Sequence, residues 1–179
     1  VGTRTKTESR WHRSRHHRPD CPTDRSLILG NDRLVFDGYN LSWSGENPQA
    51  WVAFSGQSDE SANEAVADIG PTPQGRFVID PANIQKFDEN DDWGSHRVKI
   101  EPMASTVKRM ADCLKVIRTG MYVHGGNVTG THGCIELNSD IDEKAFFKRL
   151  AEYGGKIELE VHYSGARALK YELKACPYP

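Results

Sequence analysis

The chain has 179 residues, of which 37% are hydrophobic and 27% are charged, and its formal net charge is −2. This length and composition suit one folded domain with a hydrophobic core, and no run of about 18 apolar residues predicts a transmembrane helix. The charge is uneven, because residues 1–18 carry six basic side chains against Glu8, so the body that follows is acidic. An acidic body argues against nucleic-acid binding.

The N-terminal segment, residues 1–26, is polar and basic, and we predict that it is a flexible tail ahead of a single domain over residues 27–179. No apolar segment follows its basic residues, so it is not a standard secretory signal. The alternative role for the tail is contact with nucleic acid or another anionic surface, or recognition by a delivery machine.

Short strands dominate the pattern that follows the tail. Apolar and polar residues alternate after the Asp37-Gly38 turn, which is typical of a β-hairpin. The segment Gly70-Pro71-Thr72-Pro73-Gln74-Gly75 predicts a defined turn, and the polar stretches 57–70 and 80–95 predict loops. The predicted strands are residues 34–36, 39–43, 51–54, 76–79, 97–100, 121–123 and 156–163.

Two helices are predicted between these strands. Apolar residues recur every three or four positions over residues 106–117, which indicates an amphipathic helix. A second helix over residues 140–153 has Ser139 as its candidate cap and Gly154-Gly155 as its stop. The sequence therefore predicts a mostly-β fold with two packed helices, in which one face of the sheet is exposed to solvent.

The most informative segment is residues 122–137, in which a histidine ends a predicted strand, a glycine-rich loop follows, and a cysteine comes after Gly133. A cysteine nucleophile needs a nearby base, because a free thiol is only slightly ionised at neutral pH. His124, held at the end of a strand, suits a general base, and the Gly125 carbonyl is a candidate to fix its tautomer. The glycine lets a substrate approach closely, and the amides of Gly133 and Cys134 are candidate oxyanion donors.

Other interpretations of the histidines and cysteines stay open. Cys134 is alternatively a small buried residue, and His124, His132 and Cys134 are alternatively three zinc ligands without an evident fourth. Cys21 and Cys176 lie near the two ends of the predicted domain. We expect a disulfide between them in an oxidising compartment, with two free thiols as the alternative.

The aromatic residues outside this segment also have two interpretations. Trp43, Trp51 and Trp93 either fill the core or line a substrate groove, and Trp93, in a polar loop, is the best candidate for a lid. Tyr122 is predicted to lie in the core, on the opposite face of its strand from His124, with substrate contact as the alternative.

The charged residues that stand out are two arginines and an acidic cluster. Arg76 and Arg97 are candidates to meet a substrate carboxylate, with ordinary surface pairing as the alternative. The acidic cluster forms either a cation site or a solvated loop, and its members are Asp88, Glu89, Asp91 and Asp92.

The motif around the cysteine resembles a known family. The run Thr131-His132-Gly133-Cys134-Ile135, with His124 on an upstream strand, is similar to the active-site signature of L,D-transpeptidase catalytic domains. The turn from Gly70 to Phe77 resembles the Pro-x-Gly turn of the same family, and the likeness covers roughly residues 33–163. The opening hairpin and the short loop between histidine and cysteine most resemble type VI secretion effectors that attack the peptidoglycan of rival bacteria.

This resemblance implies a β-sandwich-like catalytic domain and a reaction that needs no metal or organic cofactor. Cys134 would attack the meso-diaminopimelate carbonyl of a tetrapeptide stem, His124 would move the proton, and D-alanine would leave. His132 and the Gly-Cys amides would support the oxyanion. Glu136 departs from the family, because many members carry Arg or Asn two residues after the cysteine. This difference changes how the substrate is expected to be bound. The candidate substrate-binding residues are Thr131, Glu136, Tyr122 and Trp93.

Three functions are compatible with this resemblance. The first is an antibacterial effector that is made in the cytoplasm and acts in the periplasm of a target cell on peptidoglycan stem peptides. It would trim them as an L,D-carboxypeptidase or exchange D-amino acids, and a cognate immunity protein would block it. The second is a housekeeping L,D-transpeptidase that cross-links its own wall, and the third is a non-catalytic wall-binding module. A papain-like endopeptidase fits less well, because that family places its cysteine before its histidine.

Overall fold

The computed structural model describes residues 2, 31–57, 63–90, 92–127, 130–163, 176 and 178–179. Apart from Gly2, the predicted tail over residues 1–26 lies outside the described residues. Strands dominate the described part, so the predicted mostly-β fold is confirmed. The elements are β1 (Arg33–Phe36), β2 (Asn40–Ser44), β3 (Gln49–Ser55), β4 (Gly75–Ile79), the 3₁₀ turn η2 (Pro81–Asn83), β5 (Gln85–Asn90), β6 (Gly94–Pro102), α1 (Ala104–Arg109), the π-helical turn η3 (Met110–Leu114), β7 (Tyr122–His124), β8 (Ile135–Leu137), α2 (Asp140–Tyr153) and β9 (Ile157–Val161).

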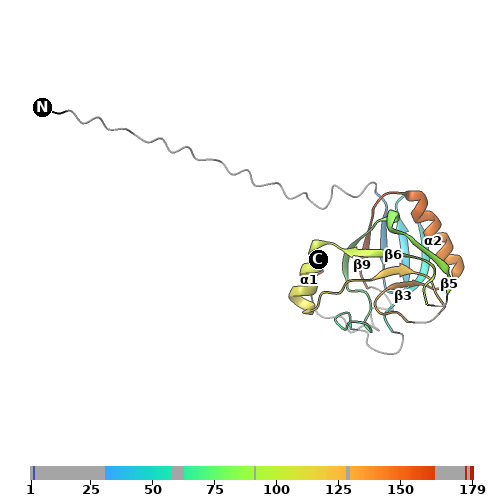
Figure 1. The fold of residues 1–179 in the computed structure, drawn as a ribbon, viewed down its shortest axis with the longest axis horizontal. Helices are drawn as coiled ribbons and strands as arrows, with labels where there is room; N and C mark the ends of the chain where they lie inside the picture. Colours follow the sequence, from blue (N-terminus) through green and yellow to red (C-terminus); the bar gives the residue numbers. More distant parts are fainter. Residues whose placement is uncertain are drawn as a thin grey trace.

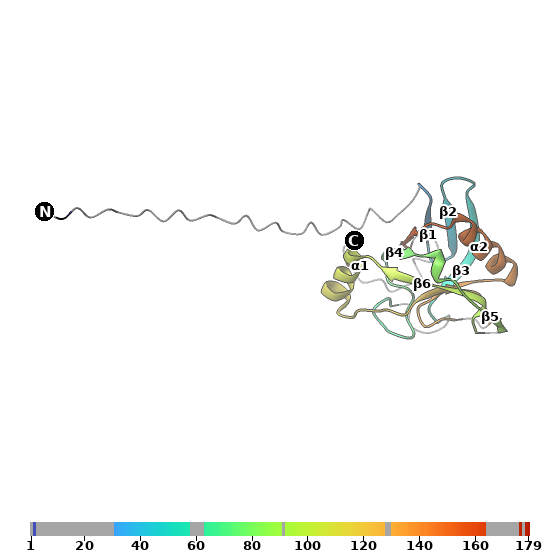
Figure 2. The same ribbon diagram turned by 45° about the horizontal axis from the view of Figure 1, so that its top comes forward.

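The strands of the described part form one sheet that closes on itself. The order of neighbours is β4-β9-β1-β2-β3-β8-β7-β6-β5, and a further pairing of β4 with β6 closes the ring, with β5 added at the side of β6. Strand β1 runs parallel to β9, and β7 runs parallel to β8. Helices α1 and α2 lie on opposite sides of this closed sheet (Figures 1 and 2).

The hydrophobic core lies inside the closed sheet, because inward and outward side chains alternate along each strand. In β1, Leu34 and Phe36 are fully buried, whereas Arg33 is exposed. Helix α2 adds Phe146, whose ring meets the edge of Trp51 with the centroids 5.3 Å apart. Trp43 and Trp51 are each 2% exposed and belong to this core cluster, so of the two interpretations the core one holds for both. Each such buried apolar side chain stabilises the fold by about 1.5–3 kcal/mol.

Helix α2 has the bounds that its sequence signals predicted. The Ser139 hydroxyl accepts a hydrogen bond from the Asp142 amide at 3.2 Å, which satisfies one of the unpaired amides of the first turn. Gly154 ends the helix with φ of 70°, a left-handed conformation that glycine adopts without steric cost. The cap and the stop are local signals, and both operate as expected.

Two local predictions were wrong. Residues 80–95 are not a loop, because η2 is followed by β5, which pairs with β6 and places Gln85 opposite Arg97. Strand β5 lies at the side of the ring, so its polar sequence lacks the hydrophobic alternation of a half-buried strand. The helix predicted over residues 106–117 ends early, since α1 gives way to η3 and Lys115 turns left-handed with φ of 61°. Ile117, the last residue of the expected apolar stripe, is 55% exposed.

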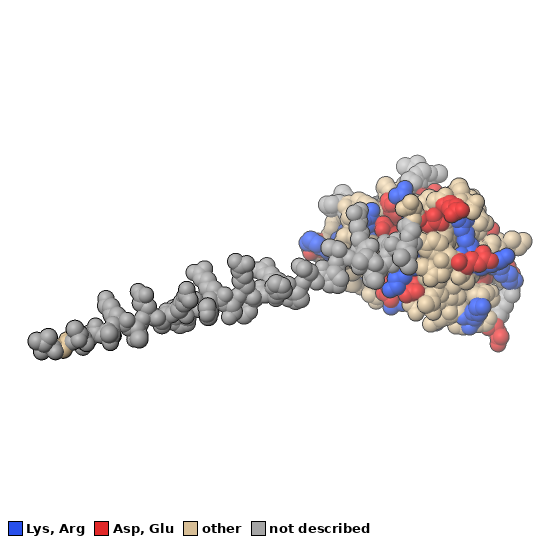
Figure 3. Space-filling view, turned by 90° about the horizontal axis from the view of Figure 1, so that it is seen from above, with Lys and Arg blue, Asp and Glu red and all other residues tan. Residues whose placement is uncertain are grey.

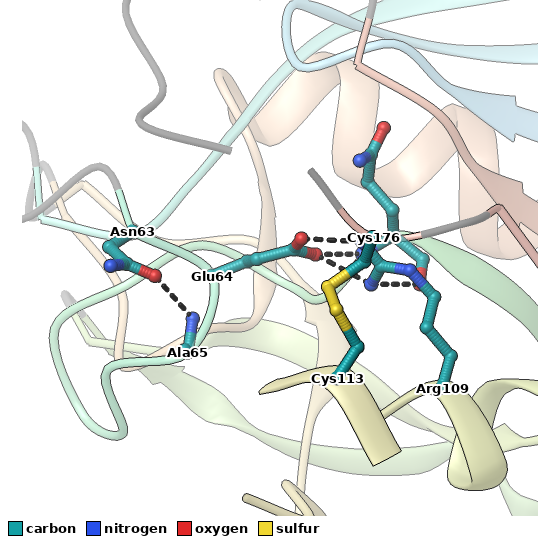
Figure 4. Close-up of a disulfide and its surroundings, with 7 residues drawn as sticks. Asn63, Glu64, Ala65, Arg109, Cys113 and Cys176 are labelled. Carbon is teal, nitrogen blue, oxygen red and sulfur yellow. Dashed lines mark hydrogen bonds and ion pairs between the residues drawn. A yellow bond between two sulfur atoms is a disulfide. The ribbon is translucent and has the colours of Figure 1, made fainter. Parts of the chain in front are cut away.

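The disulfide prediction was also wrong, because Cys176 is bonded to Cys113 rather than to Cys21 (Figure 4). Cys21 lies outside the described residues. The bond ties the C-terminal end of the chain to η3. Beside it, Arg109 forms a buried ion pair with Glu64, with an Nη2–Oε1 distance of 2.6 Å. Cys113 lies within the apolar periodicity of residues 106–117, so its sequence context gave no sign of a partner 63 residues away.

The surface gives little direct indication of a partner. The face seen in Figure 3 carries basic and acidic side chains side by side, with no large area of one sign among the described residues. In the described part of the chain, every helix is too short or too polar to cross a lipid bilayer.

Candidate active site

His124 and Cys134 lie on neighbouring strands and line the same cavity. His124 ends β7, Cys134 directly precedes β8, and the parallel register sets Val123 opposite Ile135. Since Val123 and Ile135 point into the core, the residues next to them point away from it. The cavity has a volume of about 370 Å³, and its lining consists of Gln57, Asp92, Trp93, His124, Gly130, Thr131, His132 and Cys134.

A larger cavity of about 740 Å³ lies between β6 and α1. Its described lining includes neither a histidine nor a cysteine, and its three lysines are each ion-paired with a neighbouring carboxylate. The smaller cavity is therefore the candidate active site, because it holds the groups that carry out nucleophilic chemistry.

His124 is held in one tautomer by the backbone. It is 4% exposed, and its Nδ1–H donates a short hydrogen bond to the Gly125 carbonyl, so Nε2 keeps its lone pair. Burial lowers the pKa of His124 below its ordinary value of 6.5, and the charge of Arg97 acts in the same direction. The Gly125 hydrogen bond and the charge of Glu143 oppose this fall in pKa. The imidazole is therefore neutral at neutral pH and can accept a proton on Nε2.

A buried carboxylate on α2, which sequence analysis missed, supports the loop after His124. Glu143 Oε1 accepts hydrogen bonds from the backbone amides of Ser95 at 2.8 Å and His96 at 2.7 Å. A Cβ on Gly125 would come within 2.0 Å of Glu143 Oε2, so only glycine fits at this position. The negative charge of Glu143 stabilises a positive charge on His124 once the base has taken a proton.

Cys134 rests as a neutral thiol. It is the free cysteine of the described part and is 5% exposed. Burial raises its pKa above the ordinary value of 9.0, while a hydrogen bond from the Tyr122 backbone and the charges of Arg118 and Arg97 lower it. A neutral thiol and a neutral imidazole therefore share the cavity. Such a pair forms a thiolate when a substrate approaches and the proton moves to the base.

Two threonine hydroxyls fix the turn that carries Cys134. Thr131 Oγ1 donates to the Cys134 carbonyl at 2.7 Å and accepts the Gly56 amide at 3.0 Å. Thr72 Oγ1, from the glycine- and proline-rich turn, donates to the Gly133 carbonyl at 2.7 Å. Thr131 therefore lies where an orienting hydroxyl was expected, and Thr72 is a second such group that the sequence did not single out.

The predicted oxyanion donors are only partly available. The Gly133 amide donates to Thr131 Oγ1 at 3.2 Å, which corrects the expectation that it points freely at a substrate. The Cys134 amide remains the backbone candidate. His132 is exposed and lines the cavity at its rim, where a substrate can reach the ring.

One side of the cavity is an aromatic cluster around Arg97. The Trp93 ring lies 4.8 Å from the His124 ring and 6.0 Å from the Tyr122 ring, centroid to centroid. The Arg97 guanidinium stacks over Trp93 at 4.8 Å and over Tyr122 at 4.7 Å. Trp93 is therefore a cavity residue rather than a core residue. Tyr122 is half-buried on the face of His124, which corrects the predicted opposite face, because residues two apart on a strand share a face.

Glu136 lies beside the cavity rather than in its lining. It is 2% exposed, and its register partner on β7 is His124. Its Oε2 has no hydrogen-bond partner, and burial raises the pKa of the carboxyl to about 8. The side chain is therefore a neutral acid at neutral pH, and its predicted contact with substrate has no counterpart in the lining of the cavity.

The remaining candidates are dispersed. Arg76 forms an ion pair with a glutamate of β9 at 3.1 Å. Of the acidic cluster, Asp88 and Glu89 belong to β5, Asp92 lines the cavity, and Asp91 is outside the described residues. Among the residues that the structure describes, no three or more His, Cys, Asp or Glu side chains form a group that could hold a metal ion.

Comparison with known proteins adds no family assignment. No protein-family model matches the sequence, and no curated protein matches it either. The function is therefore inferred from the site geometry and from the motif that the sequence carries.

Proposed function

We propose that the chain is a cysteine acyltransferase of the L,D-transpeptidase type that acts on tetrapeptide stems of peptidoglycan. The observation that carries this proposal is that His124 and Cys134 line the same cavity. In that cavity the Gly125 carbonyl holds Nδ1–H of His124 and leaves Nε2 as the base. The motif Thr131-His132-Gly133-Cys134-Ile135 supports the choice of family.

The proposal includes the β-sandwich-like catalytic fold of that family. A mostly-β closed sheet with two short helices is compatible with such a domain. The Thr72 turn supports the assignment further, because it resembles the Pro-x-Gly turn of the family and its hydroxyl bonds the backbone next to the nucleophile.

In the first half of the reaction, Cys134 Sγ attacks the carbonyl of the third stem residue and its proton moves to His124 Nε2. The new S–C bond gives a tetrahedral oxyanion, which the Cys134 amide and the His132 ring can approach. When the C–N bond breaks, the protonated His124 gives its proton to the leaving amine of D-alanine. Glu143 stabilises the imidazolium during this interval.

In the second half, an acceptor resolves the thioester. Its N–H or O–H proton passes to His124 Nε2, its nitrogen or oxygen attacks the carbonyl, and Cys134 leaves with the proton returned to sulfur. Water gives L,D-carboxypeptidase trimming, and a free D-amino acid gives exchange. Both products lack the donor D-alanine that cross-linking needs, which fits an antibacterial effector acting in the periplasm of a target cell.

Purified tetrapeptide muropeptides test this proposal directly. The parent protein, Cys134→Ala and the matched thiol control Cys21→Ser are each incubated with them, with and without a free D-amino acid, and products are identified by mass spectrometry. We expect loss or exchange of the terminal D-alanine with the parent and with Cys21→Ser, and unchanged muropeptides with Cys134→Ala. Unchanged muropeptides with a folded parent whose Cys134 still alkylates would exclude the peptidoglycan function.

A further inference from the structure

Arg118 is a buried arginine next to the nucleophile, and the sequence did not single it out. It lies between η3 and β7 and is 5% exposed. Its four hydrogen bonds within the described part of the chain go to backbone carbonyls rather than to acids. Their acceptors are Pro71 at 2.5 Å, Gly70 at 3.0 Å, Glu64 at 3.1 Å and His132 at 3.2 Å.

Arg118 forms no ion pair with the Glu64 carboxylate, and the charge of Asp68 acts on it more strongly than that of Glu64. Glu64 directs its carboxylate to Arg109 instead, with contacts of 2.6 and 2.9 Å, and also accepts the Gln74 amide at 2.8 Å (Figure 4). Arg118 therefore meets Glu64 only through the backbone carbonyl. Within the described part of the chain, no carboxylate lies within ion-pair distance of Arg118.

The guanidinium packs against the His132–Gly133 turn that leads into Cys134. A Cβ on Gly133 would come within 2.0 Å of Arg118 Nη2, and Gly133 has φ of 99°, a conformation that favours glycine. Of the charges that act on Cys134, Arg118 is the strongest that lowers the pKa of the thiol, ahead of Arg97. Two features, close packing against Gly133 and a charge effect on Cys134, thus connect Arg118 to this turn.

We propose that Arg118 is a positioning residue for the acyl transfer: it holds the His132–Gly133 turn and places an unpaired positive charge beside Cys134. This inference rests on the proposed function and deepens it, because it explains how a buried thiol can become a thiolate. The charge favours the thiolate when His124 takes the proton.

A purely structural role would not require a charge at this position. Burial penalises the charged form of an arginine that has no counter-ion, whereas neutral donors could bond the same carbonyls without that penalty. Arginine keeps its proton under all ordinary conditions, so the field at Cys134 is permanent. The four carbonyls and the charges of Asp68 and Glu64 offset part of this cost, and Cys134 is the reactive group among those whose negative charge favours the guanidinium.

The test measures the nucleophile without any peptidoglycan substrate. In a Cys21→Ser background, the rate at which iodoacetamide alkylates Cys134 is followed from pH 6 to pH 10 by peptide mass spectrometry. Arg118→Gln is expected to slow alkylation at pH 7.5 by about five- to tenfold and to move the pH profile to higher pH. Arg149→Gln is the matched control, because Arg149 also bonds a backbone carbonyl, that of Glu46, but does not act on Cys134.

Arg118→Lys separates charge from positioning. It is expected to keep the parental alkylation profile while slowing D-alanine release at least about threefold, since one ammonium group cannot span four carbonyls. If Arg118→Gln does not fold, the test uses Arg118→Lys alone. An alkylation profile of Arg118→Lys that is displaced to higher pH would then overturn the inference.

If a folded Arg118→Gln variant shows the same pH dependence of Cys134 alkylation as the parent, the inference is also overturned. Failure of the parent to process muropeptides, together with a displaced Arg118→Gln profile, would instead reject the peptidoglycan substrate and leave the role of Arg118 intact.

Discussion

Replacing the buried Glu136 by glutamine will change how the stability of the fold depends on pH. Burial raises the pKa of this carboxyl from its ordinary value of 4.5 to about 8. At 1.36 kcal/mol for each unit of pKa, the full effect is about 5 kcal/mol, and it is reached only above pH 8. Between pH 5 and pH 7.5 we expect a loss of about 3 kcal/mol from this group alone.

The sign follows from proton binding. Between pH 4.5 and pH 8 the folded state keeps the proton on Glu136 and the unfolded state releases it, so rising pH favours unfolding. The effect vanishes only below about pH 3.5, where both states are protonated, because at pH 4.5 the unfolded carboxyl is still half ionised. Glutamine has no such titration, so the wild-type protein loses stability relative to Glu136→Gln as the pH rises.

Urea denaturation followed by tryptophan fluorescence measures this difference, with both proteins kept oxidised. The free energies of unfolding of wild type and Glu136→Gln are compared at half-unit steps from pH 5 to pH 7.5. Burying the glutamine amide costs the same free energy at every pH. This cost therefore does not affect how the difference in unfolding free energy between the two proteins changes with pH. A difference that stays constant within about 0.5 kcal/mol would show that Glu136 is ionised in the folded state, and the reasoning would be refuted.

Four further outcomes are expected. The rate of D-alanine release should fall to half its maximum below pH 6.5, because the lowered pKa of His124 keeps the base neutral; an acid limb at or above pH 6.5 would contradict this. Ser139→Ala should cost about 1 kcal/mol in urea denaturation, since the Asp142 amide loses its acceptor. Gly133→Ala should lower stability by about 1–3 kcal/mol and abolish D-alanine release, whereas a fully active variant would show that the turn adapts. Arg109→Met should cost about 3–5 kcal/mol by leaving the Glu64 carboxylate buried and unpaired, and adding Glu64→Gln should recover part of that loss.

Local signals in the sequence were sufficient for helix α2 and for the strand pattern, but not for the end of the helix predicted over residues 106–117. Helix α2 begins after Ser139 and ends before Gly154, as predicted, because capping and the left-handed stop act within one turn. The mostly-β fold followed from period-two alternation, which records the burial of one face of each strand. The proximity of His124 and Cys134 followed from the motif, since a short loop joins them.

The sequence failed where a residue's role depends on a distant segment. Strand β5 has no hydrophobic alternation because its stability comes from pairing with β6. Cys113 looked like part of an amphipathic helix, and the prediction for Cys176 chose the wrong partner, because spacing along the chain does not reveal which thiols meet in space.

The sequence by itself determined the secondary structure of the best-patterned segments and singled out His124 and Cys134, which the structure places in one cavity. The tertiary structure alone decided what surrounds them: Glu143 beneath Gly125, Thr72 on the nucleophile turn, and Arg118 beside Gly133. Each of these contacts joins residues more than ten positions apart. Burial and charge at a site depend on which segments the fold brings together, whereas a pattern along the chain records only the neighbourhood of each residue.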